Sequence, residues 1–237
     1  MGGTAMSKPV ALIAGAGSGL SASLARLFAR EGYRIALAAR DVGKLAPLAV
    51  ETGASVHACD VSNAASVEEL FAGIEGPLRV VVAHPSARVR GPVAELDPED
   101  VRQALMVTAY GSFLIGQEAA RIMLEQEPDN GVRGTILFTG ASAGVKGYPQ
   151  SAPFAMGKFA QRGLAQSMSR ELHPKGIHVA WINIDGGIRN PGRTEPADKP
   201  DSMLDPDAIA QTYLALVRQD RSAWSAEIAV RPWVETF

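Results

Sequence analysis

The chain has 237 residues, of which 46% are apolar, and its formal net charge at pH 7 is −2. This length and composition support one sizeable hydrophobic core and are short for two. Because neither sign of charge gathers into a long run, nucleic acid and anionic membrane surfaces are poor candidates as partners.

The first segment, residues 1–7, is predicted to be a disordered leader ahead of the fold, and the alternative is that Met6 is the start. It lacks the apolar stretch of a secretory signal peptide. No apolar run in the chain reaches the ~18 residues of a membrane-spanning helix. The single cysteine, Cys59, excludes an intramolecular disulfide and a cysteine-based metal cluster. This cysteine usage fits a reducing compartment, so a cytoplasmic protein is expected.

From residue 8 onward, short apolar runs alternate with segments of helical periodicity. The run Leu78–Ala83 is almost unbroken, which is typical of a strand buried on both faces. Asp97-Pro98-Glu99-Asp100 is typical of a helix start, with a cap, a proline and acids in the first turn. The predicted strands are 10–14, 35–39, 54–58, 78–83, 136–139, 179–184 and 227–231, and the predicted helices are 20–32, 42–51, one capped by Ser62, 97–126, 151–173 and 206–219.

This alternation predicts a parallel sheet covered by helices on both faces. The right-handed crossover rule then favours a single-domain Rossmann fold, an α/β doubly wound sheet of about seven strands. We find no internal repeat and no linker, so one domain is expected over residues 8–237. The proline- and charge-rich stretch Arg189 to Asp205 is interpreted as a surface loop within that domain.

The loop after the first predicted strand, Gly15-Ala16-Gly17-Ser18-Gly19, leads into a helix at Leu20. Glycines in this position let backbone amides approach a pyrophosphate at the helix N-terminus. Two incomplete spacings compete, G-x-G-x-x-G ending on Leu20 and G-x-x-x-G-x-G ending on Ser21. A glycine-rich turn without phosphate is the alternative, and the flanking strand and helix favour a dinucleotide.

The end of the second predicted strand bears on which dinucleotide would bind. An acid there would accept from the ribose hydroxyls and select NAD, whereas Ala39 and Arg40 leave room and a donor fork for a 2′-phosphate. NADP is therefore favoured over NAD, and the alternative is that Arg40 is a solvated charge beside Asp41. Asp60 has two equally weighted interpretations, an acceptor for the adenine amine or a capping acid before Ser62.

Taken in order, these features resemble the short-chain dehydrogenase/reductase family over nearly the whole chain. The resemblance rests on the loop Gly15–Gly19, Asp60-Val61 after the third strand, Ser142 after the fifth, Lys158 in the next helix, and Ala180–Ile188, which is similar to the family's segment at the nicotinamide end. It implies cofactor contacts from Gly15, Gly17, Ser18, Gly19, Leu20, Arg40, Asp60, Val61, His84, Lys158, Gly186 and Ile188.

The family's chemistry rests on an asparagine, a serine, a tyrosine and a lysine. The tyrosine exchanges a proton with the substrate oxygen, the lysine lowers the tyrosine pKa and holds the ribose, and the serine orients the carbonyl. Ser142 and Lys158 match the serine and the lysine, whereas Phe154 stands at the tyrosine position and Thr108 at the asparagine position. A phenyl ring donates no proton, and loss of the acid costs roughly 10²–10⁴-fold in rate.

Nearby polar residues are candidates to replace the missing acid. Tyr148 is favoured as a loop or substrate-wall residue over an acid, and Ser151 stands where the family's enoyl-thioester branch has its tyrosine. Asp185 is favoured as a turn aspartate over a base. His84 is favoured as a hydrogen-bonding group near the ribose. The remaining histidines, His57, His173 and His178, have no partner cluster, so no metal site is expected.

Phe154 and Lys158 lie four residues apart, so the ammonium is expected near the ring in a cation–π contact. A solvated helix lysine is the alternative for Lys158. The resemblance also implies a homodimer or homotetramer built on helices 101–126 and 151–172. It places the substrate lid at residues 189–205, whose small apolar content argues against a long fatty or steroid substrate.

Three functions remain open. The first is an NADP-preferring oxidoreductase that acts on a small carbonyl compound or alcohol with atypical proton-transfer residues. The second is a non-catalytic dinucleotide-binding protein, either a sensor or a partner subunit. The third is an enzyme of another reaction type that keeps the nucleotide as a scaffold.

Overall fold

Seven parallel strands form the main sheet in the computed structural model, which describes residues 8–235. Their order is β3-β2-β1-β4-β5-β6-β9, so the chain changes direction across the sheet between β1 and β4. This is the doubly wound arrangement that the sequence predicts. The strands are β1 (Val10–Ala14), β2 (Arg34–Ala39), β3 (Ser55–Ala58), β4 (Leu78–Ala83), β5 (Gly134–Thr139), β6 (Ile177–Ile184) and β9 (Glu227–Val230).

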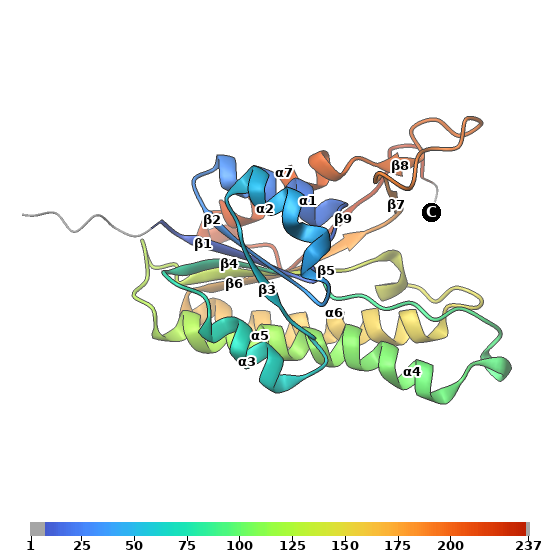
Figure 1. The fold of residues 1–237 in the computed structure, drawn as a ribbon, viewed down its shortest axis with the longest axis horizontal. Coiled ribbons are helices and arrows are strands. Elements are labelled where there is room, and N and C mark those ends of the chain that lie inside the picture. Colours follow the sequence, from blue (N-terminus) through green and yellow to red (C-terminus); the bar gives the residue numbers. More distant parts are fainter. Residues whose placement is uncertain (1–7, 236–237) are drawn as a thin grey trace, which may run out of the picture.

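Helices cover both faces of the sheet, as Figure 1 shows. One face carries α1 (Leu20–Arg30), α2 (Ala46–Thr52) and α7 (Pro206–Val217), and the other carries α3 (Ala64–Ala72), α4 (Pro98–Leu105), α5 (Gly111–Glu125) and α6 (Ala152–Leu172). Short 3-10 turns are η1 (Val42–Leu45), η2 (Val93–Glu95), η4 (Ser142–Gly144), η5 (His173–Lys175) and η6 (Arg221–Ala223). Within residues 8–235, no helix is long and apolar enough to span a membrane.

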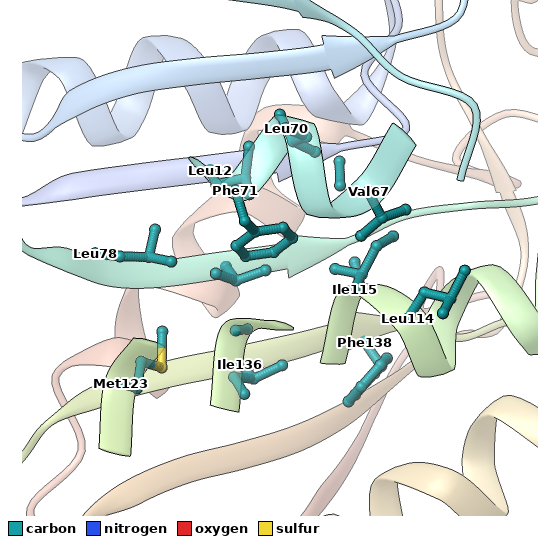
Figure 2. Close-up of a cluster of buried hydrophobic side chains, with 14 of the residues drawn as sticks. Leu12, Val67, Leu70, Phe71, Leu78, Leu114, Ile115, Met123, Ile136 and Phe138 are labelled. Atoms are coloured by element: carbon teal, nitrogen blue, oxygen red, sulfur yellow. The ribbon is translucent and has the colours of Figure 1, made fainter. Parts of the chain in front are cut away.

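Each face of the sheet has its own hydrophobic core. Figure 2 shows the core beneath α3 and α5, where Leu70 and Phe71 of α3 meet Ile115 of α5 over strand residues such as Ile136. The second core joins α1, α2 and α7 to the opposite face. Burying each such side chain contributes about 1.5–3 kcal/mol. Strands covered on both faces must be apolar throughout, which is why they appear as unbroken apolar runs.

The predicted helix over 97–126 contains a π-helical turn, η3 (Met106–Tyr110), between α4 and α5. Thr108 lies in the middle of that turn. Single π-helical turns insert a residue into a helix and are frequent at functional sites. Helical periodicity predicts the length of this segment but does not reveal the extra residue.

The prediction that Ser62 caps the third helix is wrong. Asn63 is the cap of α3, and its side-chain oxygen accepts from the backbone amide of Ser66 at 3.1 Å. The Ser62 hydroxyl is already used, because it donates to Asp60 Oδ1 at 2.7 Å.

The loop at 189–205 is closed at its base by two strands that the sequence pattern did not predict. β7 (Gly187–Ile188) pairs in parallel with β8 (Met203–Leu204), and Arg189 forms a 2.6 Å ion pair with Asp205. Strands of two residues are too short to show a period. The leader predicted at residues 1–7 and the last two residues of the predicted domain lie outside the described residues.

Candidate functional site

Among the cavities at the carboxyl-terminal side of the sheet, two are lined by the predicted site residues. The first cavity has a volume of about 490 Å³ and is lined by residues 15–18 after β1, 39–41 after β2, Lys44, Val61 and residues 84–86 after β4. The second cavity measures about 310 Å³ and is lined by residues 141–143 after β5, residues 148–151, Phe154 of α6 and two arginines. In an open parallel sheet, ligands bind outside the carboxyl ends of the strands near the change of strand order.

The glycine loop packs closely against the end of β4. Gly15 has φ +86, and a Cβ there would lie 2.9 Å from the carbonyl carbon and oxygen of His84. Only glycine fits this position without strain. Gly19 is the N-cap of α1 and provides no side-chain cap, so the first amides of the helix remain available to an anion. At Gly17 a Cβ would meet nothing within 4 Å.

Two basic side chains contribute positive charge to the lining of the first cavity. Arg40 and Lys44 both line it. Lys44 Nζ lies 3.0 Å from Asp41 Oδ2, so this acid is paired with the lysine and not with Arg40. Lys44 did not figure in the sequence prediction, because a lysine in a short surface helix has no distinguishing pattern.

Asp60 is turned toward its own loop. Its Oδ1 accepts from the backbone amide of Ser62 at 3.0 Å, and the two hydrogen bonds from Ser62 lower the pKa of the Asp60 carboxyl. Its neighbours Cys59 and Val61 line the first cavity and Asp60 does not. Its contact with adenine therefore stays a prediction.

Other predicted cofactor contacts, including Gly19, also lie outside the lining of both cavities. Leu20 is the first residue of α1 and is buried in the core on that face. Ile188 belongs to β7 and is partly buried against the same core. Gly186, by contrast, lines the second cavity.

His84 borders the first cavity with a neutral ring. Its Nδ1 is buried and has no hydrogen-bond partner in the described part of the chain. Burial, with a smaller contribution from the charge of Lys158, lowers the pKa of His84 to about 4. A buried polar nitrogen without a partner costs free energy, and a ligand hydroxyl would satisfy it.

Lys158 is buried, and its ammonium lies among carbonyl oxygens. It donates to the carbonyl of Thr139 at 2.7 Å, to Gln161 Oε1 at 3.3 Å and to the carbonyl of Pro85 at 3.5 Å. Burial, with a smaller effect of Arg88, lowers the pKa of Lys158 to about 7. The solvated alternative is therefore wrong, and Lys158 lines neither cavity.

The expected cation–π contact of Lys158 with Phe154 is also wrong. The cation over this ring is Arg88, whose guanidinium carbon lies 4.2 Å from the ring centroid. The Lys158 ammonium turns inward to the carbonyls at the ends of β4 and β5. The face of the Phe154 ring is therefore open to Arg88, from the loop after β4. Nothing in the sequence pattern of that loop indicates this contact.

A buried polar network continues from Lys158 into the long helix. Gln161 Nε2 donates to Ser112 Oγ at 2.9 Å, and Ser112 Oγ donates to the carbonyl of Thr108 at 2.6 Å. Thr108 Oγ1 accepts from the amide of Ala87 at 3.0 Å. The sequence reasoning missed Gln161 and Ser112. Their signal is a glutamine three residues after the lysine and a serine four residues after Thr108, both on buried helix faces.

Ser142 lies in the turn η4 directly after β5, half-buried beside Phe154. The hydroxyls that can reach the second cavity belong to Ser142, Tyr148 and Ser151. Asp185 is buried and lies 3.4 Å from Arg231, so it is an ion-paired residue that the turn interpretation did not foresee. Residues 8–235 contain no group of three or more metal-binding side chains.

The known proteins that this chain resembles are dehydrogenases and oxidoreductases. The family model described as short chain dehydrogenase matches residues 9–195. An uncharacterised oxidoreductase of Staphylococcus aureus is 26% identical over 238 residues, which cover 97% of this chain and 99% of that protein. The crystal structure of a short-chain dehydrogenase from Rhodopseudomonas palustris has 34% identity and a TM-score of 0.80, covering 95% of this chain and 99% of that one. A metagenomic short-chain oxidoreductase in complex with NADP is 26% identical, with a TM-score of 0.79 and coverage of 97% and 99%.

Proposed function

The chain belongs to the short-chain dehydrogenase family, and from that premise we propose that it is an NADP-preferring oxidoreductase of a small carbonyl compound or alcohol. The observation that carries the proposal is the cradle formed by Gly15 against the carbonyl of His84, at the uncapped start of α1. The related metagenomic oxidoreductase was crystallised with NADP. The matched relatives are named oxidoreductases and dehydrogenases, which favours an enzyme over a non-catalytic binding protein.

The residues around the first cavity suit an anionic dinucleotide. Backbone amides of the loop 15–19 would hold the pyrophosphate, because a helix N-terminus favours negative charge. Arg40 would contact a 2′-phosphate through its planar fork. The unpartnered Nδ1 of His84 would bond a ribose hydroxyl. When bound, NADP(H) supplies the acceptor or donor of hydride.

The second cavity would hold the substrate. Ser142 has no side-chain hydrogen bond within the described residues, so its hydroxyl is available to a substrate oxygen. A donor held in place for a carbonyl oxygen stabilises the negative charge that develops there during reduction. Phe154 contributes no proton, so the proton that completes the alcohol has to reach the cavity through its hydroxyls or from water.

Lys158 would support the second cavity indirectly, without lining it. Its ammonium holds the ends of β4 and β5 together through the carbonyls of Pro85 and Thr139. Those strands lead into the two cavities, so the lysine positions the loops that carry His84 and Ser142. Its predicted contact with the nicotinamide ribose requires the side chain to leave at least one of these acceptors.

Titration with NADPH and with NADH, followed by turnover assays on small ketones and aldehydes, tests the proposal. We expect tighter binding of NADPH, and we expect Arg40→Gln to weaken NADPH binding roughly tenfold while NADH binding changes little. Arg30→Gln, which removes an exposed charge at the end of α1, is the matched control. Failure to bind either nucleotide refutes the proposal, and equal affinity for both refutes the preference.

Ser142→Ala tests the substrate end separately. We expect it to lower kcat by roughly 10²-fold with nucleotide affinity unchanged, because the hydroxyl acts on the charge formed during the reaction. An unchanged rate would remove Ser142 from the mechanism.

A further inference from the structure

The second cavity carries strong positive charge. Arg88 and Arg90 both line it, together with Ser142 and Phe154, and no aspartate or glutamate is among its lining residues. The cavity volume of about 310 Å³ suits a small molecule. The walls of this cavity therefore contain more positive charge than a neutral ketone requires.

The two arginines have no acidic partner. Within residues 8–235, neither Arg88 nor Arg90 has a carboxylate oxygen within 4.0 Å, although ten other ion pairs are present. Arg88 and Arg90 are both exposed to solvent. Partial desolvation, followed by the charges of Arg90 and Arg193, lowers the pKa of Arg88. Cations that repel one another at a cavity, with no anion between them, are stabilised when an anion binds.

The ring at the tyrosine position holds one of these cations in place. The guanidinium of Arg88 lies over the Phe154 ring at 4.2 Å, and Phe154 itself is buried. A guanidinium stacked on an aromatic face keeps its N–H groups in the plane, where they can bind a carboxylate or phosphate through two hydrogen bonds. Phenylalanine thus gives Arg88 a fixed platform at the position where the family has its acid.

We propose that the substrate carries a compact oxyanion, a carboxylate or a phosphate, which Arg88 and Arg90 bind while Ser142 faces the reacting oxygen. This inference rests on the proposed function for the identity of the reacting group, but the anion site exists independently of turnover. Binding of the anion orients the substrate and neutralises the arginines.

Matched pairs of compounds test the proposal. Pyruvate, acetoacetate and levulinate are compared with their methyl esters, and dihydroxyacetone phosphate with dihydroxyacetone, in the oxidation of NADPH. We expect kcat/KM to favour at least one anion over its neutral partner by roughly tenfold or more. The carboxylate and phosphate arms distinguish the two sources of the oxyanion. Equal kcat/KM for the anion and its neutral partner in every pair would overturn the proposal.

Binding is also measured without turnover. The same anions are titrated by calorimetry into the free protein and into its NADP⁺ complex, in which reduction cannot occur. If neither nucleotide binds but an anion does, the proposed function fails and the anion site stands. If NADP⁺ binds and no anion binds better than its neutral partner, this inference fails and the proposed function stands.

Charge-removing variants locate the site. Arg90→Gln and Arg88→Gln are each expected to reduce the anion preference roughly tenfold, chiefly through KM, with the affinity for NADPH unchanged. Arg88 packs on the Phe154 ring and Arg90 does not. Arg90→Gln therefore tests the proposal even if Arg88→Gln fails to fold. Arg88→Lys should restore only part of the preference, because an ammonium cannot form the planar fork. A preference that survives both glutamine variants, or falls equally in Arg30→Gln, would place the anion elsewhere.

Discussion

Lys158 shows how one buried charge is tolerated in this protein. Its ammonium has three oxygen acceptors, at 2.7, 3.3 and 3.5 Å, and no carboxylate among them. Desolvation therefore dominates over pairing, and the pKa of the lysine falls to about 7. The charged form is held at a cost, which binding of an anionic nucleotide nearby would reduce.

This cost predicts a pH-dependent stability. The pKa of Lys158 is about 7 in the folded protein, against about 10.4 for an unfolded lysine, so the unfolded chain binds more protons between these values. Stability of the wild type relative to Lys158→Met should therefore rise as the pH increases from 7 toward 10, by at most about 1.4 kcal/mol per unit. Urea unfolding at pH 7, 8 and 9 measures it, with the exposed Lys175→Met as control. Parallel profiles for wild type and Lys158→Met would contradict the assignment.

Phe154 supports a second prediction at the scale of the residue. Phe154→Tyr adds a hydroxyl to a ring that lines the second cavity, where it would be a further proton donor. We expect turnover of a reducible substrate to rise roughly 10²-fold or more. Steady-state kinetics measures this, and Tyr148→Phe, which removes a hydroxyl from the cavity rim, should change the rate far less. No gain in the tyrosine variant would mean that proton transfer does not limit the reaction.

At the scale of the element, the approach of α6 to the π-helical turn depends on Gly157. A Cβ at this position would lie 2.9 Å from the Cβ of Thr108, closer than real side chains come. The same contact sets the position of Thr108, whose Oγ1 binds the amide of Ala87 at the loop that leads to Arg88. Helix packing is thus linked to the loop that carries Arg88, which lines the second cavity, through one hydrogen bond.

Gly157→Ala is therefore expected to destabilise the protein by about 1–3 kcal/mol, because the added methyl group forces α6 away from η3. The same substitution at Gly163, in the same helix, meets nothing within 4 Å. Gly163→Ala should instead stabilise the protein by up to about 1 kcal/mol, since alanine is the better helix former. Urea unfolding of both variants separates packing from helix propensity. Equal effects at the two positions would show that the close approach is not what matters.

At the scale of the whole molecule, several large hydrophobic side chains of α5 and α6 are exposed. Phe113 and Leu124 of α5 and Met156 and Phe159 of α6 are large hydrophobic side chains exposed to solvent. These helices lie together in the layer beneath the sheet (Figure 1). Exposed apolar groups on adjacent helices are typical of a surface that another chain covers.

The exposed surface of α5 and α6 is the expected interface of a homodimer or homotetramer. We predict that the wild type is larger than a monomer in size-exclusion chromatography with light scattering. Phe113→Asp together with Phe159→Asp should yield a monomer, because buried charges at an interface are costly. Val50→Asp, which changes an exposed apolar residue of α2, should leave the size unchanged. A monomeric wild type would refute the prediction.

The fold could be predicted from the sequence because its signals are local. Strands buried on both faces must be apolar, and helices that cover them must be amphipathic, so Leu78–Ala83 and the helix after Asp97 follow from composition and spacing. The glycine loop and the matching order of Ser142 and Lys158 indicated the family for the same reason. The two-residue strands β7 and β8 and the π-helical turn left no period to detect.

By itself, the sequence determined the doubly wound fold and the segments that meet at the carboxyl ends of the strands. Only the tertiary structure decided which side chains contact one another there. Lys158 turns inward to the carbonyls of Pro85 and Thr139, and Arg88 takes the face of Phe154 instead. Arg88 and Phe154 are far apart in sequence, and loop paths follow from packing rather than from a period. The two ends of the stretch Phe154–Lys158 therefore make separate contacts, which only the tertiary structure decided.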